Sequence, residues 1–462
     1  MKDLFLGVVA DDFTGASDAA SFLVEAGVST VMFNGVPEKL PELRDDTAAV
    51  VVAMKTRTIP AEEAVDEMLA AFRWLKEIGA KQLYFKYCAT FDSTAKGNIG
   101  PVADAVLDAW KIPCTILCPA LPVNGRTVRD GKLYVNGIPL SESHMKNHPL
   151  TPMTESDVTK LIEMQSKYRA AKVSVEEMIK AGAADGNCCG GAAGKDGKIR
   201  YLVPEFYEAG HGDLIAETFG DLPFLTGGSG LCGALGRRYV RRKKAAEEAQ
   251  CGAADKDTAA PYNEEGLNTA GPAGKMGSGP AGKALLLAGS CSKITLEQIA
   301  DYKEKGHPFL QILPEKLLAG EQSAETAFAW AQNAGSGALI YSSQSPEEMR
   351  ASQALGQERV AEAIEQAMSE LAAKAVQAGW TRIISAGGET SGAVTRALGY
   401  DAFYIGKSVA PGVPMMTPVE RPELRIVLKS GGFGQTDFFE RAERQTAEQE
   451  GSIWRSGNTR TL

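Results

Sequence analysis

Two adjacent carboxylates stand near the start of the chain, where an apolar run gives way to a turn. In VADDFTGASD (9–18), Asp11 and Asp12 directly follow the apolar residues, and Thr14 and Gly15 come next. One such aspartate can cap a following helix and favour its positive end. The other can accept hydrogen bonds from a polyol substrate, with Thr14 adding a contact. We therefore assign Asp12 to the substrate, and for Asp11 both roles stay open.

A denser polar cluster lies in KYCATFDSTAKGNIG (86–100). It gathers hydroxyls, cations and a carboxylate in one short turn: Lys86, Asp92, Ser93, Thr94, Lys96 and Asn98. Such a set suits a small ligand that carries hydroxyls and a carboxylate, although a polar loop with ordinary capping has a similar composition. Arg57 adds a planar fork that can pair bidentately with a substrate carboxylate, unless it is simply exposed. Asn124 and Arg126, which follow another apolar run, complete the expected substrate residues.

Glycine-rich segments of a different character lie in the C-terminal part. AGSCS (288–292), SAGGETSGAV (385–394), GVP (412–414) and KSGGFGQTD (429–437) each follow or flank an apolar run. Without a Cβ, glycine lets backbone N–H groups approach an anion, and a following helix adds donors and its dipole. None is a Walker A or a G-x-G-x-x-G motif, and each alone is compatible with a tight turn. Together they predict a nucleotide phosphate site.

The overall composition argues against several classes of protein. The chain has 462 residues, 44% hydrophobic and 23% charged, and its net charge of −9 argues against a nucleic-acid binder. No apolar run approaches the roughly 20 residues that span a bilayer, and the N-terminus lacks signal-peptide features, so we expect a cytoplasmic protein. The cysteines form no C-x-x-C pair, and His144 and His148 precede Pro149 in an expected loop. No metal site is therefore predicted.

Alternating apolar runs and amphipathic segments must position these residues. Among the first 120 residues we expect strands and helices in turn: strands at 5–10, 29–33, 46–54, 82–88 and 114–120, and helices at 15–27, 60–80 and 98–110. Near-continuous apolar strands between helices predict a mainly parallel sheet that is covered on both faces. A turn-rich stretch from 121 to 143 predicts a β-hairpin beside it. The polar clusters follow strands, where α/β proteins bind ligands.

The chain is expected to form two α/β domains with mainly parallel sheets. Its length favours more than one core. Residues 1–242 form the expected substrate domain, and 243–282, rich in glycine and alanine, reads as a flexible linker. Residues 283–462 form the expected nucleotide-binding domain, because apolar strands alternate with helices again from residue 284.

The reaction that fits these two domains best is phosphoryl transfer from a nucleotide to a hydroxyl of a small polar substrate. Catalysis of this kind is mostly positioning and charge neutralisation, with Mg²⁺ bridging the phosphates. Two alternatives stay open on the residues alone. One is a dehydrogenase that uses the glycine turns for a dinucleotide, and the other is a sugar-acid sensor that turns nothing over. A homodimer is also left open, and neither a nucleic acid nor a membrane is expected as a partner.

The longer motifs resemble those of a known family. The segments include VADDFTGASDAASFLVEAG, FDSTAKGNIGPV, CPALPVNGRT, LTGGSGL, AGSCS, AGGETSGAV and KSGGFGQTDFF. Together they are similar to the four-carbon acid sugar kinases, and within that family to the 3-oxo-tetronate 4-kinases. The resemblance covers nearly the whole chain, except for two Gly/Ala-rich stretches at 181–198 and 243–282. It implies an acid-sugar-binding domain followed by a nucleotide-binding domain.

The resemblance also implies an activity and a set of residues. The activity is ATP-dependent phosphorylation of the 4-hydroxyl of a 3-oxo-tetronate, with D-threonate or D-erythronate as the alternative substrate. The implied ATP-site residues lie in the glycine motifs: Ser290 or Ser292, Gly387, Gly388, Glu389, Thr390, and Gly431 or Gly432. The implied acid-sugar residues are Asp12, Arg57, Lys86, Asp92 and Thr94.

The catalytic assignment rests on Asp12, which we expect to accept or orient the proton of the 4-hydroxyl. Asp92 is the competing candidate. A third alternative is that no base is essential, because a loose transition state needs little deprotonation of the nucleophile. Lys96 replaces the arginine of a D-S-T-x-R-G motif that relatives acting on unoxidised acids often carry, which favours the oxo-acid group.

Overall fold

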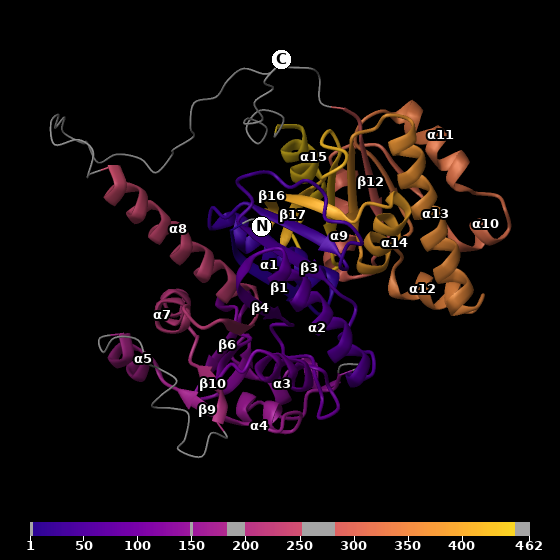
Figure 1. The fold of residues 1–462 in the computed structure, drawn as a ribbon. Coiled ribbons are helices and arrows are strands. Elements are labelled where there is room, and N and C mark those ends of the chain that lie inside the picture. Colours follow the sequence, from indigo (N-terminus) through magenta and orange to yellow (C-terminus); the bar gives the residue numbers. More distant parts are fainter. Residues whose placement is uncertain (1–2, 148–150, 183–198, 252–281, 449–462) are drawn as a thin grey trace. The chain divides into compact units, whose positions relative to one another are not determined.

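The computed structural model describes residues 3–147, 151–182, 199–251 and 282–448 (Figure 1). Contacts between residues divide the chain into two compact units. The first unit comprises Met1–Lys244 together with Asp401–Ser408, and the second comprises Ala245–Tyr400 and Val409–Leu462. Each unit is an α/β structure, which confirms the predicted fold class.

The first unit contains a mainly parallel sheet. Its strands, in spatial order, are β16 (Ala402–Ala410), β2 (Thr30–Asn34), β3 (Ala49–Ala53), β1 (Leu4–Ala10), β4 (Ala80–Lys86), β11 (Phe224–Gly227), β5 (Thr115–Cys118), β10 (Ile199–Pro204) and β9 (Arg169–Val173). Of the strands just named, only β16 runs against its neighbour, pairing antiparallel with β2. Most residues of the central strands are buried, because helices cover both faces.

Helices connect these strands. They are α1 (Phe13–Glu25), α2 (Ala61–Glu77), α3 (Ile99–Ala109), α4 (Val158–Glu163), α5 (Val175–Gly182), α7 (Ala209–Phe219) and α8 (Ser229–Cys251). Helix α2 shows why they form: acidic side chains fill its first turn, Lys76 lies in its last, and Ala64, Met68, Phe72 and Leu75 are buried along one face. The expected helices at 15–27, 60–80 and 98–110 are confirmed.

The predicted hairpin beside the sheet is also present. Strands β6 (Arg126–Arg129), β7 (Lys132–Val135) and β8 (Ile138–Pro139) form a separate antiparallel sheet. Both of its turns contain Asx-Gly pairs with positive φ, Asp130-Gly131 and Asn136-Gly137, as tight hairpins require. His144 begins a short 3-10 helix (His144–Asn147), and His148 lies outside the described residues.

The second unit also contains a mainly parallel set of strands. Its strands, in spatial order, are β13 (Phe309–Gln311), β14 (Ala338–Tyr341), β12 (Ala284–Ala288), β15 (Arg382–Ala386), β18 (Arg425–Lys429) and β17 (Val413–Pro418). They pair in parallel except for β17, which is antiparallel to β18. The helices are α9 (Lys293–Glu304), α10 (Pro314–Leu318), α11 (Ala324–Ala334), α12 (Pro346–Gln353), α13 (Gln357–Gln377), α14 (Gly388–Leu398) and α15 (Phe438–Glu448).

The unit boundaries differ from the expected domains in two places. Residues 243–251 of the expected linker are the end of helix α8, and 252–281 lie outside the described residues. Residues 401–408 belong to the first unit, because the start of β16 pairs with β2. Among the described residues no helix is both long and apolar enough to cross a membrane.

Candidate active site

The parallel strands of the first unit end level with one another. Ala10 of β1 lies beside Ala53 of β3 and Lys86 of β4, and Lys86 lies beside Gly227 of β11. The connection after β1 leads to β2 on one side, whereas the connection after β4 leads to β5 on the other. The sheet therefore has a topological switch point between β1 and β4, which is the usual position of a ligand crevice.

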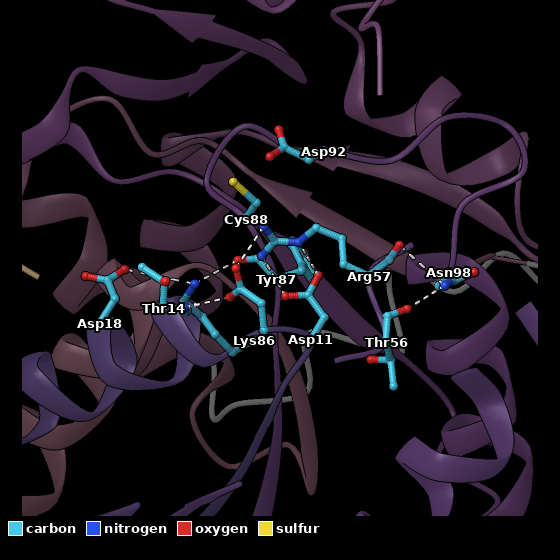
Figure 2. A network of polar contacts seen from close by, with 12 residues as sticks. Asp11, Thr14, Asp18, Thr56, Arg57, Lys86, Tyr87, Cys88, Asp92 and Asn98 are labelled. Carbon is cyan, nitrogen blue, oxygen red and sulfur yellow. Dashed lines mark hydrogen bonds and ion pairs between the residues drawn. The ribbon is translucent and has the colours of Figure 1, made fainter. Parts of the chain in front are cut away.

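A cluster of opposite charges occupies this switch point. Arg57 donates to both carboxylate oxygens of Asp11, over 3.1 Å from Nε and 2.8 Å from Nη2. Its Nη1 lies 3.0 Å from Oδ2 of Asp12. Figure 2 shows Arg57 and Asp11 together, with Asp92 set apart from them. The bidentate partner of Arg57 is thus Asp11, not a substrate carboxylate as expected; two of its five N–H groups stay outside these contacts.

The two adjacent aspartates occupy different positions, and the helix cap is Asp12. Asp11 continues β1, since its N–H donates to the carbonyl of Lys86, and its side chain is buried. Asp12 is the helix cap, and its Oδ1 accepts a 2.6 Å hydrogen bond from Gly15. Burial raises the pKa of Asp11, while Arg57 opposes that shift. The same two carboxylates raise the pKa of Arg57, so this guanidinium stays charged and holds both.

Lys86, an expected substrate residue, lies next to this cluster and is paired with Asp18, which the sequence analysis did not single out. Lys86 is 3% exposed, donates to the carbonyl of Tyr87 over 3.0 Å, and lies 4.0 Å from Asp18 Oδ2. Ser229, at the start of α8, donates to the same oxygen over 2.5 Å. Burial raises the pKa of Asp18, and its Oδ1 has no hydrogen-bond partner among the described residues. The motif LTGGSGL (225–231), which spans the end of β11 and the start of α8, is the sequence signal for Ser229.

A cavity of about 230 Å³ adjoins the charged cluster. Its lining includes most of the residues expected from the second polar cluster: Arg57, Asp92, Ser93, Thr94, Lys96, Gly97 and Asn98. Asp92 accepts a 2.6 Å hydrogen bond from Thr90, which fixes the carboxylate. The Lys96 side chain is exposed, so its ammonium is accessible to a ligand that enters the cavity. The structure thereby brings a carboxylate, two hydroxyls and two cations to one small cavity.

Other expected residues have structural partners or lie elsewhere. Asn98 donates to the carbonyls of Thr56 over 2.6 Å and Ile59 over 2.9 Å, so its amide ties the two loops together. Thr14 is exposed on the first turn of α1. Asn124 and Arg126 are not among the residues that line the cavity, and they make no contact with the charged cluster among the described hydrogen bonds and ion pairs. The Arg126 guanidinium instead donates to the Asn124 carbonyl. Their expected substrate contacts find no support in the described residues.

The second unit repeats the geometry with different chemistry. Ala288 of β12, Ala386 of β15 and Lys429 of β18 are paired in register. The glycine motifs of all three strands therefore begin at the same level. The connection after β12 leads toward one edge of the sheet, to β13, and the connection after β15 leads in the opposite direction. This reversal places a second switch point between β12 and β15.

Backbone groups, rather than side chains, fill this second switch point. Gly387 has a φ of +132°, and a Cβ there would lie 3.0 Å from the Ser290 nitrogen. A Cβ on Gly431 would lie 2.2 Å from the Ser290 hydroxyl oxygen. Helix α14 begins immediately after Gly387, so the N–H groups of Gly388, Glu389 and Thr390 belong to its first turn. Such an array of donors fits a polyphosphate.

The structure separates the two serines that the sequence left ambiguous. Ser292 caps α9 by accepting from Thr295 N, and its hydroxyl also donates to the Gly431 carbonyl over 2.6 Å. Ser290 accepts a 3.2 Å hydrogen bond from the N–H of Ser292 and keeps its hydroxyl proton for another partner. Ser290 is therefore the serine that can donate to a ligand, whereas Ser292 shapes the turn.

A cavity of about 500 Å³ continues from this turn along α9 and is lined by Cys291, Lys293, Leu296, Glu297 and Ala300. Its mixture of apolar and charged lining is compatible with a nucleoside. Among the described residues no group of three or more His, Cys, Asp or Glu side chains is arranged to hold a metal ion.

Comparison with known proteins identifies the family. Residues 6–235 match a sugar-binding N-terminal domain, and residues 285–439 match a nucleotide-binding C-terminal domain. A Haemophilus influenzae protein named 3-oxo-tetronate kinase is 41% identical over 442 residues, covering 95% of this chain and 99% of the relative. A 3-oxo-tetronate kinase from Brucella melitensis is 40% identical and covers 98% of each chain. This chain belongs to the four-carbon acid sugar kinase family.

Solved structures extend the family match to the fold. A crystal structure of a Haemophilus influenzae protein has a TM-score of 0.79 at 39% identity, and covers 95% of this chain and 100% of its own. A Salmonella typhimurium structure has the same TM-score at 38% identity, with 95% and 99% coverage. The resemblance predicted from the sequence motifs is thereby confirmed.

Proposed function

We propose that this member of the four-carbon acid sugar kinases is an ATP-dependent 3-oxo-tetronate 4-kinase, in keeping with the name 3-oxo-tetronate kinase that its relatives carry. The observation that carries the proposal is the contrast between the two switch points. One holds carboxylates, cations and hydroxyls around a small cavity, and the other presents glycine turns and a helix N-terminus. A polyol acid requires the first arrangement and a nucleotide polyphosphate the second.

In the substrate crevice, Asp12 is proposed to accept the hydrogen bond of the 4-hydroxyl. Its contacts with Gly15 and Arg57 fix the carboxylate, and each oxygen keeps acceptor capacity. Arg57 and Lys96 offer the positive charge that a substrate carboxylate needs. Because the transition state is loose, Asp12 is required mainly to aim the hydroxyl oxygen at the phosphorus. Asp92 is the alternative acceptor, since it lines the cavity.

In the nucleotide crevice, the N–H groups at the start of α14 and the Ser290 hydroxyl would bind phosphate oxygens. Mg²⁺, when bound, would neutralise the negative charge of the phosphates. It commonly needs only one or two protein carboxylates besides phosphate and water. Glu389, exposed in the first turn of α14, is the residue that would hold it. A cytoplasmic location and a homodimer belong to the proposal as well.

An ADP-release assay with a panel of acceptors tests this function. We expect ADP from a 3-oxo-tetronate, much less from D-threonate and D-erythronate, and none above background from simple sugars. The two epimeric 3-oxo-tetronates should be assayed separately, because the crevice is chiral. Preference for an unoxidised acid would support the alternative substrate. If no acid yields ADP, the kinase assignment fails, and binding of the acids without turnover would then favour a sensor.

A further inference from the structure

A buried lysine lies beneath the last glycine turn of the second unit. Lys429 is the final residue of β18 and is 1% exposed. The described ion pairs contain no carboxylate partner for it, and burial alone lowers its pKa to about 8. An unpaired ammonium inside a protein is costly unless hydrogen bonds or a bound anion compensate it. The position of Lys429 therefore requires an explanation other than charge pairing within the fold.

Lys429 donates to the Ser430 carbonyl over 3.3 Å, and another of its hydrogen bonds meets those of two hydroxyls at the Gly431 carbonyl. Its Nζ donates to Thr295 Oγ1 over 3.0 Å and lies 3.4 Å from the Gly431 oxygen. That same oxygen accepts from Thr295 over 3.0 Å and from Ser292 over 2.6 Å. Two residues of α9 and the end of β18 thus hold a single carbonyl of the glycine turn.

The orientation of this carbonyl fixes the next N–H. The described chain has no cis peptide bond, so the Gly431 C=O and the Gly432 N–H point in opposite directions. Gly432 is exposed, and its N–H makes no hydrogen bond among the described residues. Pulling the carbonyl into the protein therefore turns the Gly432 donor outward, in a turn whose preceding residue, Gly431, lies next to the Ser290 hydroxyl.

We propose that Lys429 is a positioning residue, which together with Ser292 and Thr295 holds the Gly431 carbonyl inward so that the Gly432 N–H faces a phosphate. This role rests on the proposed function, because it takes ATP as the ligand. The side chains that meet the Lys429 ammonium are Thr295 of α9 and the Phe438 ring of α15, neither of which titrates near neutral pH. The ammonium also adds positive potential below the turn.

The charge of Lys429 gives the proposal a pH signature. A bound polyphosphate stabilises the ammonium, so ATP binding should raise the pKa of Lys429 from its value of about 8. By linkage, ATP then binds more weakly as the pH rises through that value, and binding takes up protons there. The phosphates of ATP are already ionised at this pH, so they contribute no opposing change.

The experiment measures ATP affinity with Mg²⁺ by calorimetry at about pH 7 and about pH 9, on either side of the lysine titration. For the wild type we expect a Kd about tenfold higher at the upper pH. Lys429→Met should raise the Kd at the lower pH by a similar factor and remove the pH dependence. Lys429→Arg should keep the affinity and lose the pH dependence, because arginine stays charged. Lys316→Met, at an exposed site in α10, should match the wild type.

Thr295→Val provides a second test, because it removes the hydroxyl that donates to the Gly431 carbonyl while conserving the size of the side chain. We expect weaker ATP binding and an unchanged KM for the acid. If Lys429→Met and Thr295→Val both fold and bind ATP as the wild type does, with the same pH dependence, the positioning role is contradicted while the kinase function stands. Absence of ATP binding by the wild type would overturn both.

Discussion

The two switch points of this protein solve different recognition problems with the same strand geometry. In the first unit, side chains at the ends of β1 and β4 carry the chemistry, and Arg57 holds Asp11 and Asp12. In the second, the strand ends carry glycines, and backbone N–H groups replace side chains. The comparison teaches that a parallel sheet supplies the position, whereas the residues after each strand decide the ligand.

The two crevices also differ in how they accommodate charge. The first contains a buried carboxylate, Asp11, which the Arg57 guanidinium holds bidentately before a substrate binds. The second contains one buried ammonium, Lys429, with no carboxylate partner among the described residues. A substrate with several polar groups suits the first arrangement, and a polyanion suits the second. Substitutions in either crevice should therefore affect only one of the two ligands.

The largest effect is expected from Asp12→Asn, which removes the acceptor proposed for the reacting hydroxyl. We expect kcat to fall by about a thousandfold, which is within the range of general acid–base contributions. Asparagine is also a good helix cap, so the melting temperature should change little. ATP affinity should stay unchanged, as calorimetry would show. Asp92→Asn is the matched comparison; if it loses the turnover that Asp12→Asn keeps, the catalytic role belongs to Asp92.

An intermediate effect is expected from Gly387→Ala in the nucleotide crevice. Its φ of +132° and the 3.0 Å approach to Ser290 N leave no room for a Cβ, and strain of about 1–3 kcal/mol predicts a roughly tenfold higher Kd for ATP. Binding of the acid should not change. Gly392→Ala in the same helix, where the nearest atom lies at 3.4 Å, is the control. Loss of acid binding in Gly387→Ala would contradict the assignment of the acid and the nucleotide to two separate sites.

The smallest effect is expected from Lys96→Ala, which removes an exposed cation from the rim of the substrate cavity. Solvent-exposed charge pairs are weak and screened by salt, so we expect about a threefold higher KM for the acid with kcat unchanged. The difference should shrink as ionic strength increases in steady-state assays. Lys81→Ala, an exposed lysine that pairs with Asp3, is the control. A fall in kcat alone would instead place Lys96 on the transferred phosphoryl group.

Much of this arrangement follows from the sequence, because apolar strands and the residues after them are local signals. The mainly parallel sheets, the hairpin with its Asx-Gly turns and the grouping of Asp92 and Lys96 in one polar turn were predicted in this way. Contacts between residues that are distant along the chain were not predicted. The pairing of Arg57 with Asp11 depends on β1 and β3 lying side by side, which no local pattern encodes.

The missed residues have the same physical origin. Asp18 and Ser229 are separated by 211 positions, and they meet only because α1 and α8 both start at the switch point. In the sequence, Lys429 is only the first residue of a glycine-rich motif, and it is the fold that buries its side chain beneath that motif. The return of residues 401–408 to the first unit is likewise a tertiary event, in which β16 pairs with β2.

The most direct test of the account is the position of the phosphate in the product. Phosphorus NMR of the reaction of ATP with a 3-oxo-tetronate should show a new signal that is split by the two protons of a CH₂–O–P group. Transfer to the 4-hydroxyl requires this splitting, because carbon 4 carries two protons. A signal split by a single proton would place the phosphate on the carbon-2 hydroxyl and contradict the proposed orientation. Release of inorganic phosphate alone would contradict transfer to the sugar altogether.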